Sequence, residues 1–115
     1  MTIYFDLART EVGRHYKSPL RLAMSAENAA RMLTILGERA ECYQFLGPER
    51  MKALLEVTNY ELKRRAAGSG DPRVRYEIPR LVQLQCLFNA ASRRQYGVAV
   101  WQEDLSAPGV AGKRK

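Results

Sequence analysis

The chain is poor in the residues that most often bind metals or form disulfides. Its 115 residues include two cysteines, Cys42 and Cys86, and one histidine, His15. Without close pairs of cysteine or histidine, a structural zinc site has no support. Both cysteines fall within predicted helices, so we expect two buried thiols that pack as small apolar groups and do not form a disulfide. We expect no metal and no other cofactor.

Long apolar runs are also absent. No stretch approaches the roughly 20 consecutive apolar residues that span a bilayer, so we expect no membrane partner. The N-terminal residues MTIYFDLARTE lack the basic start and apolar core of a secretory signal. These observations favour a cytoplasmic location.

Sets of catalytic residues are missing as well. Residues 68–71, GSGD, resemble a phosphate-binding loop only superficially, because no Gly-Lys-Ser/Thr follows them. His15 can be paired with Asp6 or Glu11, although a lone histidine in a basic loop is more often solvated surface. We therefore expect that the protein is not an enzyme. A helix-turn-helix is not evident either, because the helix after Pro48 is not the basic one.

Three short segments alternate apolar and polar side chains, which is the period of a half-buried strand. Residues 2–7 place Ile3 and Phe5 on the side expected to face the core. The same period recurs in residues 20–24 and in residues 98–102. We therefore predict two strands near the N-terminus and one near the C-terminus.

Two helices are predicted between these strands. Ser25 suits the N-cap of the first, whose apolar pattern continues to residue 46. Pro48 suits the first turn of the second, which is expected to end at Gly68. Because the break between them is short, we expect the two helices to pack as an antiparallel hairpin.

A third helix, predicted over residues 78–97, is the most apolar part of the chain. Pro79 suits its first turn, and Gly97 suits the position that closes its last turn. One face carries Leu81, Leu84, Leu87, Phe88 and Ala91. A second apolar row consists of Val82, Cys86 and Ala90. A helix with so little polar surface is usually covered on more than one side, so we place it at the centre.

This order predicts an α+β fold that is mainly helical, with three helices and a small sheet formed by the N- and C-terminal strands. The alternative is an all-α three-helix domain with extended ends. Residues 1–105 are long enough for a single compact domain with one core. The remaining residues, 106–115, have nothing to bury and are expected to form a disordered basic tail.

The formal net charge is +7, and it is unevenly distributed. Residues 63–94 hold eight basic side chains against two acidic ones, a net charge of +6. The eight are Lys63, Arg64, Arg65, Arg73, Arg75, Arg80, Arg93 and Arg94. Seven of them are arginines, whose planar guanidinium matches phosphate and stacks on bases.

We therefore predict a small nucleic-acid-binding or nucleoprotein-associated module that contacts mainly phosphate through these eight residues. Tyr76 and Tyr96 lie beside the arginines and can stack on unpaired bases. A polar strip of Gln85, Asn89 and Ser92 can contact base edges or RNA hydroxyls. We expect the only tryptophan, Trp101, to pack against the helices.

Other interpretations of the same residues stay open. Basic residues at the ends of helices are often solvated surface that complements the helix dipole. The positive charge also fits an adaptor or inhibitor that docks on an acidic protein surface. A homodimer is a third possibility, because a second copy can cover the apolar surface of the third helix.

Overall fold

The computed structural model describes residues 1–9, 17–68 and 71–103, and it omits the side chain of the last of these. The elements follow one another as β1 (Thr2–Ala8), β2 (Leu22–Ser25), α1 (Ala26–Ile35), β3 (Gln44–Leu46), the 3-10 turn η1 (Pro48–Arg50), α2 (Met51–Ala66), α3 (Pro72–Arg94) and β4 (Gly97–Glu103). The predicted tail, 106–115, lies outside the described residues, as do residues 10–16, which include His15.

The strands form one antiparallel four-stranded sheet in the order β2-β1-β4-β3. The two terminal strands are its central pair, with Tyr4 opposite Trp101 and Leu7 opposite Val98. The prediction of an α+β fold is confirmed, and the all-α alternative is wrong. The prediction that only terminal strands form the sheet is also wrong, because β3 comes from the middle of the chain.

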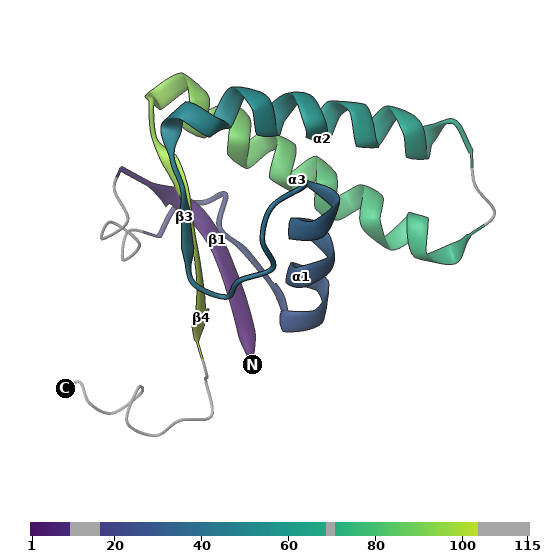
Figure 1. Cartoon of the computed structure of the whole chain (residues 1–115), viewed down its shortest axis with the longest axis horizontal. Helices are drawn as coiled ribbons and strands as arrows, with labels where there is room; N and C mark the ends of the chain where they lie inside the picture. The colour runs from purple at the N-terminus through teal and green to yellow at the C-terminus, as the bar shows by residue number, and fades with distance from the viewer. Residues whose placement is uncertain (10–16, 69–70, 104–115) are drawn as a thin grey trace.

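All three helices cover the same face of this sheet (Figure 1). The alternation predicted for β1 is observed, since Ile3, Phe5 and Leu7 are at most 1% exposed and belong to the main core. The apolar face predicted for the third helix lies against them, and its members Leu84 and Phe88 are 0% exposed. Alternating strands and one amphipathic helix therefore build the core that their periodicity indicates.

The other face of the sheet carries Trp101, contrary to our expectation that it packs against the helices. Its ring stacks on Tyr4 with 5.4 Å between the centroids, and the guanidinium of Arg21 lies 4.8 Å from the indole centroid. Arg21 also donates from Nε to Asp6, which is completely buried and accepts a further bond from the N–H of Ser18. Because β4 alternates, Trp101 points away from its neighbour Val100 and hence away from the helices.

The first predicted helix is much shorter than expected. Ser25 is the N-cap, as predicted, but α1 ends at Ile35 because Gly37 adopts a left-handed conformation with φ of +79°. The N–H groups of Gly37 and Glu38 close the last turn on the carbonyls of Thr34 and Leu33, which is a Schellman motif. The chain then turns back, and Gln44–Leu46 joins the sheet beside β4 instead of continuing a helix.

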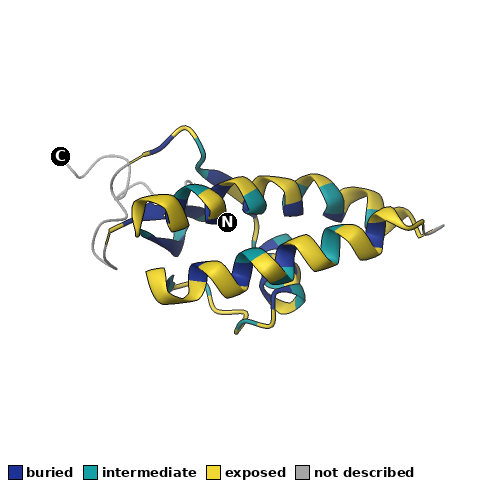
Figure 2. Ribbon diagram, turned by 90° about the horizontal axis from the view of Figure 1, so that it is seen from above, coloured by how far each residue is buried: buried dark blue, intermediate teal, exposed yellow. Residues whose placement is uncertain are grey.

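The helical hairpin is formed by α2 and α3, not by the first two predicted helices. The two helices run side by side and extend beyond the sheet (Figures 1 and 2), with exposed residues along their outer side. Pro48 opens the short turn η1 that leads directly into α2, and Gly68 follows its end with φ of +108°, as a helix stop requires.

The third helix begins six residues earlier than predicted. Asp71 is its N-cap, and the Asp71 carboxylate accepts a hydrogen bond from the N–H of Arg73. Pro72 occupies the first helical position, so Pro79 lies inside the helix. A proline there removes one backbone hydrogen bond, which the capped first turn and the buried residues on both sides of Pro79 must offset.

The end of the third helix also differs from our prediction. The left-handed residue is Gln95, with φ of +59°, and the N–H of Tyr96 closes the turn on the carbonyl of Ala91. Gly97 instead starts β4 and is buried. A Cβ atom on Gly97 would lie 2.3 Å from the carbonyl oxygen of Leu46, so this glycine permits the close approach of two chain segments.

The second apolar row of α3 is only partly covered within the described chain, because Ala90 packs against the core and the other two members are exposed. Val82 is 42% exposed and Cys86 is exposed, so the prediction that both rows are covered is wrong for the monomer. The prediction of two buried thiols is likewise wrong, because Cys42 is only half-buried and lies outside any helix. A homodimer that covers this row stays a prediction.

Candidate functional site

The eight cations predicted to bind nucleic acid do not form one surface. Six of them lie towards the end of the hairpin where α2 ends and α3 begins, whereas Arg93 and Arg94 lie at the other end of α3. At 1.5 Å per residue, Arg93 is about 27 Å along the helix axis from Arg75. A single contact that uses all eight therefore requires a long ligand.

Arg65 is only 9% exposed and belongs to an ion-pair network within the protein. Its Nε donates to Glu77 Oε1 over 2.9 Å, and its guanidinium also contacts Glu61. Arg64 contacts the same Glu61 carboxylate over 3.1 Å. These contacts occupy Arg65 inside the hairpin, so we exclude it from the residues offered to a ligand.

Glu77 extends this network to α1, because its Oε2 accepts from Arg31 Nε over 2.6 Å. Burial alone would raise the pKa of Glu77, but hydrogen bonds from Arg31 and Arg65 and their positive charges hold it below the ordinary value. The network therefore contains an ionised carboxylate that joins all three helices.

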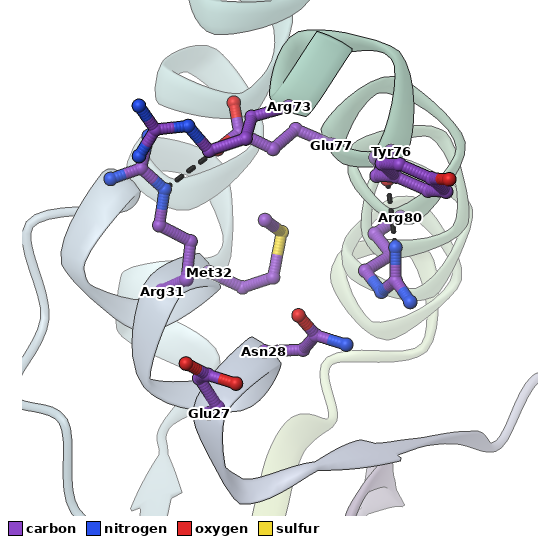
Figure 3. A pocket seen from close by; sticks show the side chains of 8 residues that line it. All are labelled: Glu27, Asn28, Arg31, Met32, Arg73, Tyr76, Glu77 and Arg80. Carbon is purple, nitrogen blue, oxygen red and sulfur yellow. Dashed lines mark hydrogen bonds and ion pairs between the residues drawn. The ribbon is translucent and has the colours of Figure 1, made fainter.

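A cleft of about 440 Å³ lies between α1 and the first half of α3 (Figure 3). Its lining residues are Glu27, Asn28, Arg31, Met32, Arg73, Tyr76, Glu77 and Arg80. Met32 is buried at the base, while Tyr76 and Arg80 form the wall contributed by α3. Three arginines and one exposed aromatic ring thus share a single concave surface.

The three cleft arginines are held in different ways. Arg80 Nη1 donates to the backbone carbonyl of Tyr76 over 2.8 Å, which positions the guanidinium without neutralising its charge. Arg73 is 81% exposed in its side chain, and its Nε lies 3.7 Å from the exposed carboxylate of Asp71. The side chain of Arg31 is 54% exposed, although its Nε is bonded to Glu77. All three can contact an anion that enters the cleft.

Two of the eight predicted residues, Arg73 and Arg80, therefore line the cleft, and the other six do not. Arg75 is exposed on α3, but at 100° per residue it points about 140° away from Arg80. Lys63 and Arg64 lie on α2.

Sequence reasoning missed Arg31, Asn28 and Glu27. They belong to a stretch whose charge is slightly negative, so no charge signal distinguishes them. Arg31 reaches the site through a contact with Glu77, which is 46 residues away in sequence. Of the two tyrosines predicted to stack, Tyr76 is 71% exposed at the cleft, whereas Tyr96 is half-buried against the core.

The polar strip of the third helix has a structural role at one position. Gln85 Nε2 donates to the side-chain oxygen of Asn59 over 2.6 Å, which links α3 to α2. Among the described residues, no cluster of three or more His, Cys, Asp and Glu side chains can hold a metal ion. His15 and Glu11 lie outside the described residues. No helix in the described part of the chain is both long and apolar enough to cross a membrane.

Comparison with known proteins found no matching family model, no matching curated protein and no matching solved structure. The site must therefore be interpreted from its own geometry and chemistry.

Proposed function

We propose that this protein binds single-stranded nucleic acid in the cleft between α1 and α3, mainly through phosphate contacts. The observation that carries the proposal is the position of Tyr76, an exposed ring on the same side of α3 as Arg73 and Arg80. Spacings of three and four residues place these side chains next to one another. An aromatic ring beside cationic groups is the arrangement that binds a base together with its phosphates.

The charges in the cleft favour an anionic ligand. Arg31, Arg73 and Arg80 stand against Glu27 and Glu77 in its lining. The charge of Glu77 is already shared with the buried Arg65, so it offsets the cleft arginines only in part. Guanidinium groups bind phosphate through several parallel hydrogen bonds, which makes a phosphate-bearing ligand the best chemical fit.

The size of the cleft favours a single strand over a duplex. A volume of about 440 Å³ is in the range of small-molecule sites and accommodates one or two nucleotides. Unpaired bases can leave their stack and lie on an aromatic side chain, whereas paired bases cannot.

A titration of a fluorescent octanucleotide, followed by anisotropy at about 50 mM and about 200 mM salt, tests this function. Three phosphate contacts to a single strand predict a log–log slope of about −2 against salt concentration. Tyr76→Ala should weaken binding by at least about fivefold, because stacking contributes about 1–3 kcal/mol per base. Arg80→Ala should weaken binding and make the log–log slope shallower by the amount that about one phosphate contact contributes.

The chain offers a matched control for each variant. Tyr60 is 63% exposed on α2 and does not line the cleft, so Tyr60→Ala should leave affinity unchanged. Arg75→Ala removes an exposed arginine from α3 outside the cleft and should also have little effect.

Three results would overturn the proposal. Absence of binding at low salt removes nucleic acid as a ligand. Equal losses in Arg75→Ala and Arg80→Ala remove the cleft as the site. Competition by polyglutamate as strong as that by the unlabelled oligonucleotide supports the alternative, an adaptor or inhibitor that docks on an acidic protein surface.

A further inference from the structure

One side of the cleft is closed by contacts within the protein. The ion pair between Arg31 and Glu77 joins α1 to α3 over 2.6 Å, and Arg65 anchors Glu77 from α2 over 2.9 Å. Figure 3 shows this bridge along one edge of the cleft, with Asn28 and Arg80 on the opposite side. A strand that lies along the base of the cleft therefore meets the bridge at this edge.

Two guanidinium groups are available at the closed side. Arg31 uses Nε for its bond to Glu77, and its Nη groups make no hydrogen bond to any other described residue. Arg73 comes from the first turn of α3, and its side chain is 81% exposed. In Figure 3 both side chains extend to the edge that the Arg31–Glu77 bridge closes.

We propose that these two arginines bind a terminal phosphate monoester, such as the 5′-phosphate at the end of a strand. This inference rests on the proposed function and specifies which part of the strand enters the cleft. An internal phosphodiester has a chain on both sides, and at the base of the cleft one of these chains meets the bridge. A monoester has only one attachment and three free oxygens, so it can occupy a closed position and contact two guanidinium groups.

The charge also favours a monoester. At pH 7 a phosphate monoester carries about −1.5 to −2, compared with −1 for a diester. Arg31 and Arg73 approach from different helices, so a ligand with the higher charge gains more from bridging them. A strand end and a free nucleoside monophosphate share this group, and the experiment must separate the two sources.

The test compares one octanucleotide in three forms: with a 5′-phosphate, with a 3′-phosphate and with hydroxyl groups at both ends. We expect the 5′-phosphorylated strand to bind the wild-type protein at least about fivefold more tightly than the unphosphorylated strand. Arg73→Ala and Arg31→Ala should each abolish most of this advantage. Arg75→Ala, only two residues from Arg73 and outside the cleft, should retain it.

Each outcome decides a separate point. Equal affinity for the phosphorylated and unphosphorylated strands overturns the terminal-phosphate inference and leaves strand binding intact. Preference for the 3′-phosphate alone supports the monoester site and reverses the direction of the strand. Competition by adenosine monophosphate as strong as that by the 5′-phosphorylated strand, with adenosine inactive, assigns the site to a free nucleotide. Absence of binding by every probe overturns both the inference and the proposed function.

Discussion

Replacing Pro79 with alanine tests the most unexpected feature of this fold, a proline inside the long helix α3. The side chain of Pro79 is exposed, so the replacement removes no core packing. A proline in a helix interior costs about 3 kcal/mol relative to alanine, through a missing hydrogen bond and a clash with the preceding turn. Greater freedom of the unfolded alanine chain offsets about 0.4–1 kcal/mol of this. We therefore expect Pro79→Ala to stabilise the protein by about 2 kcal/mol.

The corresponding change in melting temperature follows from the size of the chain. An unfolding entropy of about 2.1 cal/mol/K per residue gives about 240 cal/mol/K for the whole chain. A gain of about 2 kcal/mol then raises the melting temperature by roughly 8 °C. Circular dichroism at 222 nm during heating, supported by urea titration, measures this change.

Pro72→Ala is the matched control, because Pro72 occupies the first helical position, where its missing N–H has no helical partner. We expect that replacement to be neutral or slightly destabilising. If Pro79→Ala behaves like Pro72→Ala, the helix does not continue through residue 79, and the reasoning above is refuted.

Three further predictions concern stability. Gly97→Ala should destabilise the fold by about 1–3 kcal/mol in urea titration, because the added Cβ meets the backbone of Leu46; an unchanged midpoint would contradict that close contact. Phe88→Ala should cost about 3–5 kcal/mol and Arg75→Ala well under 1 kcal/mol, and the reverse order would show that their burial is misassigned. Folding lowers the pKa of Glu77, so the ionised carboxylate stabilises the fold fully at neutral pH. This stabilisation is lost as pH falls below about 4.5. Glu77→Gln should therefore lower the free energy of unfolding at pH 7, and this free energy should then fall less steeply between about pH 5 and pH 3 than it does in the wild type. If the variant and the wild type lose stability equally over this range, Glu77 does not contribute to the acid sensitivity of the fold.

Local patterns in the sequence were sufficient for the features that repeat with a regular period. The alternation of Ile3, Phe5 and Leu7 predicted the central strand β1, and the spacing of Leu84 and Phe88 predicted the buried face of α3. Such patterns succeed because each residue's exposure is set by the period of its own element.

The errors occurred where a local pattern fits two structures. Cys42, Phe45 and Leu46 continue a helical spacing, yet the left-handed turn at Gly37 ends the helix and releases them to pair with β4. Pro79 suits a helix start, but Asp71 and Pro72 supply a better one upstream. The pairing of residues 44–46 with β4 depends on distant residues, which a local pattern does not contain. The start of α3 at Asp71 and Pro72 is a local signal that our prediction passed over.

The candidate site was predictable only in part for the same reason. Charge counting found Arg73 and Arg80, and the aromatic neighbour Tyr76 was visible beside them. It also selected Arg65, whose charge is used within the hairpin, because a count of cations does not show which of them face carboxylates. It missed Arg31, which becomes part of the site only when α1 packs against α3.

By itself, the sequence determined which side chains of β1 and of the main apolar face of α3 point to the core, where the excess positive charge lies along the chain, and that helices and strands coexist. These properties follow from residue type and from the short periods of helices and strands. Only the tertiary structure decided that β3 completes the sheet, that Arg65 forms ion pairs within the hairpin, and that three arginines and a tyrosine border one cleft. Those outcomes depend on which distant segments pack together, because packing determines where each charge finds its partner.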